Sequence, residues 1–313
     1  MKILVIGGTR LLGLSVVHRL LESQHSVTVL SRRPENCPSG ARCIGADRGV
    51  GLDNLAGEPF DMVIDFVAYN SEAVVEVLKK IPDANYVLIS STWITRLNPN
   101  SSGEKQVTDI DQNSLAYLPV VTRKYLLGKQ EAESTVFKAR QEGWQATVLR
   151  LPIFFGDGDH TGRLDFYKRR FIDHGAIISV DGGRNLANIA WTEDIARTFP
   201  SWLPVAIRYP IWDALTDPGL PVRQIVGYII GNMTSPNIFV DIPSVFLAEH
   251  LPLYLENEPL WKETPLTPSE NNIFLATGIV PTPYFKWLTF LSGAPDQSPT
   301  ELREKELRLI ERI

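Results

Sequence analysis

Short apolar runs rich in β-branched residues alternate with stretches of helical periodicity through the first half of the chain. The runs are KILVIG, SVTVL, ARCIGA, MVIDFVAY, YVLISST and ATVLRLPIFF, and helical stretches such as LSVVHRLLESQ and AVVEVLKKI separate most of them. Strands that are apolar on both sides belong to parallel sheets covered by helices on both faces. We therefore predict an α/β fold built on a doubly wound parallel sheet.

The regular order loosens after Gly156, where proline and tryptophan become frequent and strands become sparse. We expect a sheet domain over residues 1–155 and a smaller lobe over 156–313, with some segments of the second range returning to the sheet domain. Two capping boxes with an internal proline, Thr267–Glu270 (TPSE) and Ser298–Glu301 (SPTE), predict helix starts. The charged segment 301–313 predicts a partly docked terminal helix.

The composition limits the partners and the compartment. The chain has 313 residues, 44% of them hydrophobic, and its net charge of −5 argues against nucleic acid or an anionic membrane as the main partner. No apolar run approaches the roughly 20 residues of a membrane-spanning helix. Cys37 and Cys43 are too few and too irregularly placed for a disulfide framework or a zinc site, which favours a reducing compartment. We expect a cytoplasmic protein without a bound metal.

The first strand runs directly into the sequence GGTRLLG. In a strand-turn-helix unit, glycines let the backbone bend tightly and approach a pyrophosphate, which then lies at the N-terminus of the helix. Gly7 and Gly13 hold the first and third positions of the glycine pattern, and Arg10 occupies the middle one. A guanidinium beside phosphate makes charge-assisted hydrogen bonds. The segment from Gly7 to Gly13, including Thr9, Leu11 and Leu12, therefore predicts a dinucleotide site, although an ordinary glycine turn is the alternative.

The end of the second strand indicates which dinucleotide binds. Proteins that bind NAD usually have an acidic residue here, whereas a ribose 2′-phosphate requires cations. This chain has Ser31, Arg32 and Arg33 instead. We predict NADP(H) as the preferred cofactor, with NAD(H) as the alternative. If the two arginines do not bind a cofactor, they are simply a solvated pair in a surface loop. Further cofactor contacts are expected from the segments after the third and fourth strands: Asp47, Arg48, Phe66, Val67 and Ala68.

The chemistry is expected at the start of the helix predicted over 120–141. Tyr125 and Lys129 are four residues apart and share one helix face with Ala132 and Val136. A lysine on the core face needs a specific partner, which the ribose hydroxyls of a cofactor would supply. Its ammonium favours the phenolate form of the tyrosine, so that Tyr125 is a candidate proton donor or acceptor. The alternative is a lysine that merely packs its stem over an aromatic ring.

Hydroxyl groups mark the end of the fifth strand. Ser90, Ser91 and Thr92 in the sequence ISSTW project at the carboxyl edge of the sheet, where ligands of open α/β sheets bind. A polar strand end without a function is the alternative. Together with Tyr125 and Lys129, these hydroxyls favour a catalytic site.

The segments GGTRLLG, ISSTW, YLLGK and RLPIFFGDGD, in this order, resemble the extended short-chain dehydrogenase/reductase superfamily, which includes nucleotide-sugar epimerases and dehydratases. The likeness spans Lys2 to about Arg197, and ATGIVPTPYFKWL weakly resembles the C-terminal lobe of that family. It implies a Rossmann sheet with a smaller C-terminal substrate-binding lobe. It also implies that Thr92 positions a substrate oxygen, that Tyr125 is the acid/base and that Lys129 holds the nicotinamide ribose. Pro152 and Ile153 match the segment that lines the nicotinamide, and a homodimer is implied by the family alone.

Two departures from the family pattern bear on the reaction. Trp93 and Ile94 stand where the sugar-nucleotide dehydratases have an Asp-Glu pair, which makes dehydration by that route unlikely. Arg10 in place of the middle glycine resembles an atypical, epimerase-like branch and favours a reductase that exchanges NADP(H). We therefore expect an oxidoreductase that moves hydride to or from a carbonyl or carbinol carbon. One alternative is an epimerase that acts on a nucleotide-linked sugar. Another is a non-catalytic, dinucleotide-sensing or RNA-associated relative, because proteins with the arginine-bearing motif include a chloroplast RNA-binding protein.

The substrate is a small molecule that the sequence does not identify. Trp93, His160 and Arg163 are candidate substrate contacts, although a surface or structural role is the more common one for a histidine such as His160. The segment 94–121 has little periodicity and is expected to be a lid or binding loop, with disorder as the competing interpretation.

Overall fold

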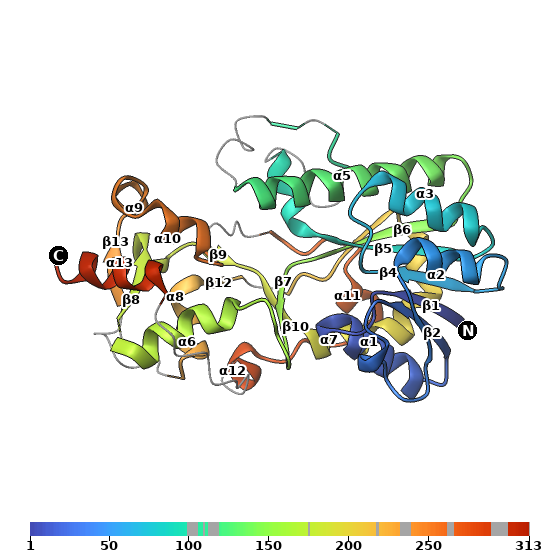
Figure 1. Cartoon of the computed structure of the whole chain (residues 1–313), viewed down its shortest axis with the longest axis horizontal. Helices are drawn as coiled ribbons and strands as arrows, with labels where there is room; N and C mark the ends of the chain where they lie inside the picture. Colours follow the sequence, from blue (N-terminus) through green and yellow to red (C-terminus); the bar gives the residue numbers. More distant parts are fainter. Residues whose placement is uncertain are drawn as a thin grey trace. The chain divides into compact units, whose positions relative to one another are not determined.

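The structure is a computed structural model. It describes residues 1–98, 106–108, 110–111, 119–174, 176–216, 219–231, 239–261, 266–288 and 300–312. The chain forms two compact units (Figure 1): unit 1 comprises Met1–Gly156, Ala190–Leu215 and Thr267–Pro281, and unit 2 comprises Asp157–Ile189, Thr216–Leu266 and Thr282–Ile313. Among the helices of the described ranges, none has the length and hydropathy needed to cross a membrane.

Unit 1 is built on a parallel sheet of seven strands in the order β11-β6-β5-β4-β1-β2-β3. The strands are β1 (Lys2–Ile6), β2 (Ser26–Ser31), β3 (Arg42–Gly45), β4 (Met62–Asp65), β5 (Asn85–Ser91), β6 (Ala146–Leu151) and β11 (Ile211–Asp213). The winding direction reverses between β1 and β4, where ligands of open α/β sheets bind. The predicted doubly wound parallel α/β sheet is confirmed.

Helices cover both faces of this sheet, as Figure 1 shows. One face packs against α1 (Leu11–Glu22), α7 (Thr192–Trp202) and α11 (Ile273–Thr277), and the other against α2 (Arg48–Leu55), α3 (Ser71–Lys80) and α5 (Val120–Gln141). Successive residues of β1 enter alternate layers: Ile3 and Val5 join the first core, and Leu4 and Ile6 the second. Because each such side chain contributes about 1.5–3 kcal/mol on burial, the double-sided apolar strands stabilise all three layers.

The segment after β5 packs on α5. It begins with the 3-10 helix η2 (Thr92–Leu97), and Ile94, Leu97 and Val107 form a small apolar cluster with Leu126 of α5. The side chain of Gln130 donates a hydrogen bond to the carbonyl oxygen of Val107 (3.0 Å). The described part of the 94–121 segment is therefore anchored, while residues 99–105, 109 and 112–118 of the predicted lid lie outside the described residues.

Unit 2 has its own core around two short sheets. Strand β13 pairs in parallel with β8, and β12 pairs antiparallel with β9. Ile178 of β8 is buried in a cluster with Leu247 and Tyr254 of the helices. Its elements are α6 (Arg163–His174), β8 (Ile177–Val180), η3 (Asp181–Gly183), β9 (Leu186–Ala187), β12 (Leu220–Pro221), α8 (Val222–Ile229), β13 (Phe239–Ile242), α9 (Ser244–His250), α10 (Pro252–Asn257), α12 (Tyr284–Trp287) and α13 (Glu301–Ile310).

The terminal helix α13 is docked through buried charges. Arg303 Nη2 lies 2.7 Å from Asp173 Oδ1, and Arg170 Nε donates to Glu306 Oε2 at 2.9 Å. Arg303 also donates to Glu306 (2.9 Å), so two cations surround one fully buried carboxylate. Charged residues that point inward, rather than an apolar stripe alone, attach this helix to α6.

Both helix starts predicted from capping boxes are displaced. Residues 266–269 are irregular, and the N–H of Ser269 donates to the Asp213 carboxylate (2.9 Å). Helix α11 begins only at Ile273, where the side chain of Asn272 caps the first turn. At the second box, α13 begins at Glu301 with Thr300 as its N-cap, and Ser298 and Pro299 lie outside the described residues.

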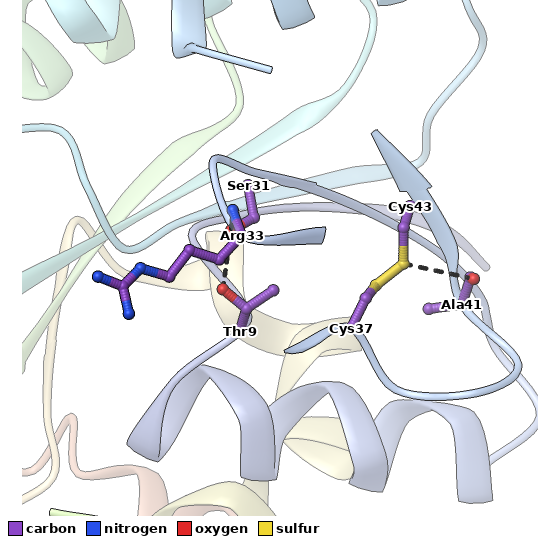
Figure 2. Close-up of a disulfide and its surroundings, with 6 residues drawn as sticks. All are labelled: Thr9, Ser31, Arg33, Cys37, Ala41 and Cys43. Atoms are coloured by element: carbon purple, nitrogen blue, oxygen red, sulfur yellow. Dashed lines mark hydrogen bonds between the residues drawn. A yellow bond between two sulfur atoms is a disulfide. The ribbon is translucent and has the colours of Figure 1, made fainter. Parts of the chain in front are cut away.

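The expectation that the two cysteines are unpaired is wrong. Cys37 and Cys43 form a disulfide with a Cα–Cα distance of 6.4 Å (Figure 2). Cys37 ends the 3-10 helix η1 (Pro34–Asn36), and a turn closed by a hydrogen bond from Ala41 N to Pro38 O (3.2 Å) returns the chain to β3. That turn brings the two Cα atoms within bridging range, which the spacing in the sequence does not reveal.

Candidate active site

The turn between β1 and α1 is a glycine cradle. Gly7 has φ +89°, and a β-carbon there would lie 2.7 Å from Val67 Cγ1. A β-carbon on Gly13 would lie 3.0 Å from the carbonyl oxygen of Gly7. Arg10 is the exposed N-cap residue of α1 and makes no side-chain cap, while Leu11 and Leu12 bury their side chains. The first N–H groups of α1 therefore face a bare backbone surface suited to an anion.

Hydroxyl groups tie this turn to the end of β2. Thr9 Oγ1 and Ser31 Oγ share a hydrogen bond of 2.7 Å, and Ser31 Oγ accepts a second one from the N–H of Arg33 (3.1 Å; Figure 2). Arg32 and Arg33 are exposed, and the Arg33 side chain extends away from the disulfide in Figure 2. Strand β2 thus ends with the neutral hydroxyl of Ser31, and two exposed cations, Arg32 and Arg33, follow it. Asp47, at the N-cap of α2, is also exposed.

Arg48 has a buried partner within the chain. Its guanidinium donates two hydrogen bonds to the fully buried carboxylate of Asp65 (3.1 and 2.6 Å) and one to the carbonyl oxygen of Ala73 (2.6 Å). The hydroxyl of Tyr86 donates to the same carboxylate at 3.0 Å. Arg48 therefore neutralises Asp65 at the end of β4, a partner that the sequence did not indicate; its predicted contact with a cofactor stays a prediction.

The segment after β4 lies between the glycine turn and α5. Phe66 N donates to the carbonyl oxygen of Ile6 (3.0 Å), and Val67 N donates to Asp65 Oδ1 (3.0 Å). Val67 packs against Gly7, and Ala68 is fully buried. These contacts hold residues 66–68 beside the cradle at the carboxyl edge of the sheet.

Tyr125 and Lys129 occupy the first turns of α5. Lys129 is only 3% exposed, and its ammonium donates to the carbonyl oxygens of Ala68 (2.9 Å) and Ile89 (2.7 Å). Tyr125, one turn earlier, is 36% exposed. The predicted stripe is therefore buried at Lys129, Ala132 and Val136 and opens toward solvent at Tyr125. The partners of the lysine within the chain are carbonyl oxygens that no sequence pattern indicated.

The environment of Lys129 sets its charge. Burial lowers the pKa of Lys129 to about 8, while the carboxylates of Asp65 and Glu133 raise it and the charge of Arg48 lowers it. Both carboxylates already have cationic partners, since Arg150 donates to Glu133 at 3.1 and 2.6 Å and Arg48 holds Asp65. Desolvation consequently outweighs attraction, and the pKa of Lys129 lies below its usual value.

The hydroxyls after β5 differ in their partners. Thr92 Oγ1 donates to the carbonyl oxygen of Leu151 (3.2 Å) at the end of β6, and Ser91 Oγ accepts from the N–H of Trp93 (3.2 Å). Ser90 is 4% exposed, and its Oγ has no hydrogen-bond partner among the described residues. A buried hydroxyl that none of these residues bonds is suited to a ligand. Pro152 is buried between β6 and β7 (Ile153–Phe155).

The candidate substrate contacts belong to different parts of the chain. Trp93 is half-buried in η2 of unit 1, whereas His160 is exposed and Arg163 half-buried in unit 2.

No group of three or more His, Cys, Asp or Glu side chains able to hold a metal ion occurs in the described ranges. The buried pair of Glu133 and Arg150 was missed, although a glutamate four residues after Lys129 and an arginine inside an apolar strand are visible in the sequence.

Comparison with known families agrees with this geometry. The profile of the NAD dependent epimerase/dehydratase family matches residues 3–200. The chain belongs to this enzyme family. The resemblance to extended short-chain dehydrogenases/reductases is thereby confirmed, and the comparison with curated proteins found no match.

Similar solved structures share the fold of this family member. A dTDP-glucose 4,6-dehydratase from Bacillus anthracis in complex with NAD has 13% identity and a TM-score of 0.69, over 93% of this chain and 95% of that one. A UDP-glucose 4-epimerase from Thermotoga maritima with UDP-glucose has 16% identity and a TM-score of 0.63, over 99% and 100%. The thiolation-reductase di-domain of an archaeal non-ribosomal peptide synthetase has 17% identity and a TM-score of 0.63, over 92% and 88%.

A nicotinamide dinucleotide, the cofactor of this family, suits the residues present. The glycine cradle leaves no room for β-carbons at Gly7 and Gly13, and the N–H groups of α1 open onto it. The Ser90 hydroxyl, which no described residue bonds, lies near the end of β5. These observations are the ones expected of a site built for a phosphate-containing ligand with ribose hydroxyls.

Proposed function

We propose that this family member is an NADP-dependent oxidoreductase of the extended short-chain type, which transfers hydride to or from a carbonyl or carbinol carbon. One observation carries the proposal: the buried Lys129 ammonium lies one helical turn after Tyr125, which is partly exposed to solvent. When bound, the cofactor supplies or accepts the hydride. The residues of the chain then have to bind, orient and exchange a proton.

Tyr125 is the proposed acid/base. Its phenol gives a proton to the substrate oxygen in reduction and takes it back in oxidation, and the nearby positive charge of Lys129 favours the phenolate. Thr92 positions the same substrate oxygen. In the structure its hydroxyl donates to Leu151 O (3.2 Å). It would turn to donate to the substrate oxygen instead, because the single proton of a carbinol goes to Tyr125 and a carbonyl oxygen has no proton to give.

The cofactor would be held along the carboxyl edge of the sheet. The turn from Gly7 to Gly13, including Thr9, Leu11 and Leu12, would bind the pyrophosphate through its backbone. Further contacts would come from Asp47 at the adenine, from Phe66, Val67, Ala68 and Ser90 beside the ribose units, from Lys129 at the nicotinamide ribose, and from Pro152 and Ile153 at the nicotinamide. The exposed guanidinium groups of Arg10, Arg32 and Arg33 would bind the ribose 2′-phosphate, supported by the neutral Ser31.

A small carbonyl or carbinol compound is the proposed substrate. Trp93, His160 and Arg163 are its proposed contacts, with unit 2 as the substrate-binding lobe. A homodimer is the proposed assembly. These assignments are tested only after the cofactor is known, because a substrate screen needs the correct cofactor.

A fluorescence titration with NADPH and NADH tests the cofactor assignment. We expect wild type to prefer NADPH and Arg32→Ala to lose at least tenfold in NADPH affinity, with little change for NADH, because one charge-assisted hydrogen bond is worth about 1.5–3 kcal/mol. Lys79→Ala is the matched control, since it removes an exposed cation from the last turn of α3. Equal affinities of wild type for the two cofactors would refute the 2′-phosphate site.

Turnover tests the acid/base assignment. With NADPH and a panel of aldehydes, ketones and nucleotide-linked keto sugars, Tyr125→Phe should lose nearly all NADPH oxidation while still binding NADPH. Full activity of Tyr125→Phe would rule out the proposed proton transfer.

An epimerase is the second candidate, because the chain belongs to a family of epimerases and dehydratases and similar structures include a UDP-glucose 4-epimerase. This function predicts tightly bound NAD in the purified protein and interconversion of UDP-glucose and UDP-galactose without net NADPH oxidation. Observation of both would replace the oxidoreductase proposal.

A further inference from the structure

A second tyrosine lies at the proposed site. Tyr69 follows Ala68 in the segment between β4 and α3, and its ring centroid is 4.6 Å from Lys129 Nζ and 6.1 Å from the ring centroid of Tyr125. The interplanar angle between the two rings is 54°. Tyr69 therefore touches both members of the proposed catalytic pair.

The backbone fixes Tyr69 in this position. A β-carbon on Gly128 would lie 2.1 Å from the carbonyl oxygen of Tyr69, so the segment approaches α5 at a place that only glycine allows. On one side, the carbonyl oxygen of Ala68 accepts from Lys129 (2.9 Å). On the other side, Asn70 caps α3 by accepting from Ala73 N (2.9 Å). Three consecutive residues are thus anchored, with the Tyr69 ring directed over the lysine.

The Tyr69 ring is a third neighbour of the lysine ammonium, beside the two carbonyl oxygens. The ammonium has three N–H donors, and two of them are used by Ala68 O and Ile89 O. An aromatic face within about 6 Å attracts a cation through the ring quadrupole, and more strongly where water is excluded. Lys129 is 3% exposed and Tyr69 is 51% exposed, so water is excluded from the ammonium although part of the ring meets solvent.

We propose that Tyr69 is a positioning residue for Lys129, whose ring covers the ammonium and holds it one helical turn from Tyr125. The inference deepens the proposed function, on which its consequence for turnover rests. The contact itself does not depend on any cofactor.

Charged groups reach Lys129 from several elements. Asp65 of β4 and Glu133 of α5 act on it as anions, and Arg48 of α2 acts as a cation. Burial raises the pKa of Tyr69, with a smaller raising effect of Asp65 and an opposing effect of Arg32. The Tyr69 phenol is therefore neutral throughout the range in which Lys129 titrates, and its ring acts as an uncharged aromatic face.

Carbon-13 NMR of the full chain, labelled at the ε-carbon of lysine, tests the contact without cofactor. Loss of one signal in Lys129→Met assigns that signal to Lys129. We expect upfield ring-current shifts of the Lys129 ε-protons in wild type and in Tyr69→Phe, and their loss in Tyr69→Leu. The Lys129 pKa should fall by about one in Tyr69→Leu, because the ring favours the charged form. Tyr228→Leu, which removes a partly buried tyrosine from unit 2, should leave both readouts unchanged.

A Lys129 signal with the same shift and titration in wild type and Tyr69→Leu would overturn the proposal. Tyr69→Met provides a second ring-free variant if Tyr69→Leu does not fold. The outcome is independent of the proposed function, because the NMR response is measured on protein alone. If NADPH turnover is found, Tyr69→Leu should lower kcat more than it raises KM and move the alkaline limb of the pH profile, while Tyr69→Phe should match wild type.

Discussion

A β-carbon on Gly128 would lie 2.1 Å from the carbonyl oxygen of Tyr69. The same stretch of α5 carries Tyr125 and Lys129, so the distance between the helix and the segment after β4 determines what surrounds the lysine. Because Gly128 has no side chain, the segment after β4 can approach α5 closely enough for Ala68 O and the Tyr69 ring both to contact Lys129.

Gly128→Ala should push the segment after β4 away from α5. Because overpacking of a close contact costs about 1–3 kcal/mol, we expect a lower free energy of unfolding in urea and a changed Lys129 NMR signal. Gly49→Ala in α2 is the control, since its β-carbon would meet only Glu76 Oε1 at 3.5 Å and a helical alanine is favourable. A Gly128→Ala protein as stable as wild type would contradict the packing described.

Lys129→Met should change how the free energy of unfolding depends on pH, because it removes a buried ionisable group. The pKa of Lys129 is lowered from 10.5 to about 8 in the folded chain, so between these values the unfolded state holds a proton that the folded state has released. The free energy of unfolding of wild type, relative to Lys129→Met, should therefore rise by about 3 kcal/mol as pH increases from 8 to 10.5, and be constant below 8. Urea denaturation across this range measures it, and a difference independent of pH would show that Lys129 titrates normally.

Ser31→Asp should reverse the cofactor preference. A carboxylate at the end of β2 repels a 2′-phosphate and can bind ribose hydroxyls, so we expect NADPH affinity to fall at least tenfold and NADH affinity to rise. Ser31→Ala removes the hydrogen bonds to Thr9 and to Arg33 N without adding charge, and it should weaken both cofactors equally. Equal effects of the two variants on NADPH would argue against a phosphate at this position.

Reduction of the Cys37–Cys43 disulfide should destabilise the connection between β2 and β3. The bond closes a loop with a sequence separation of 6, for which the chain-entropy relation gives about 2 kcal/mol. Dithiothreitol should lower the free energy of unfolding of wild type by that amount and leave Cys37→Ser unaffected. Free thiols in the native, unreduced protein, detected by mass spectrometry after alkylation, would show that the pair is not bonded.

Local patterns predicted the sheet and one helix well. The apolar runs became the parallel strands β1 to β6, and the stretch 120–141 became α5 with the bounds expected. Both depend on short-range periodicity, which burial on both faces of the sheet reinforces. The first capping box did not start a helix: residues 266–269 are irregular, the N–H of Ser269 donates to Asp213, far away in the sequence, and α11 begins only at Ile273.

The residues that line the candidate site were visible in the sequence, but their partners were not. The glycine turn, the arginines after β2, Tyr125 and Lys129 follow from strand-turn-helix and helical spacing, and their roles in catalysis and cofactor binding remain predictions. Arg48 was predicted as a cofactor contact because it follows β3, and the structure pairs it with Asp65. Its choice of partner depends on how α2 lies against β4, a relationship that the spacing along the chain does not contain.

The alternation of strands and helices in the first half of the chain, the parallel sheet and the family could be predicted from the sequence alone, because each depends on local residue patterns. Tertiary structure decided which buried charges meet, that Cys37 and Cys43 bond, and that Tyr69 covers Lys129. These contacts join residues brought together by chain turns and by close approaches such as the one at Gly128. Electrostatic and covalent partners act over a few ångströms in space, whatever their separation in sequence.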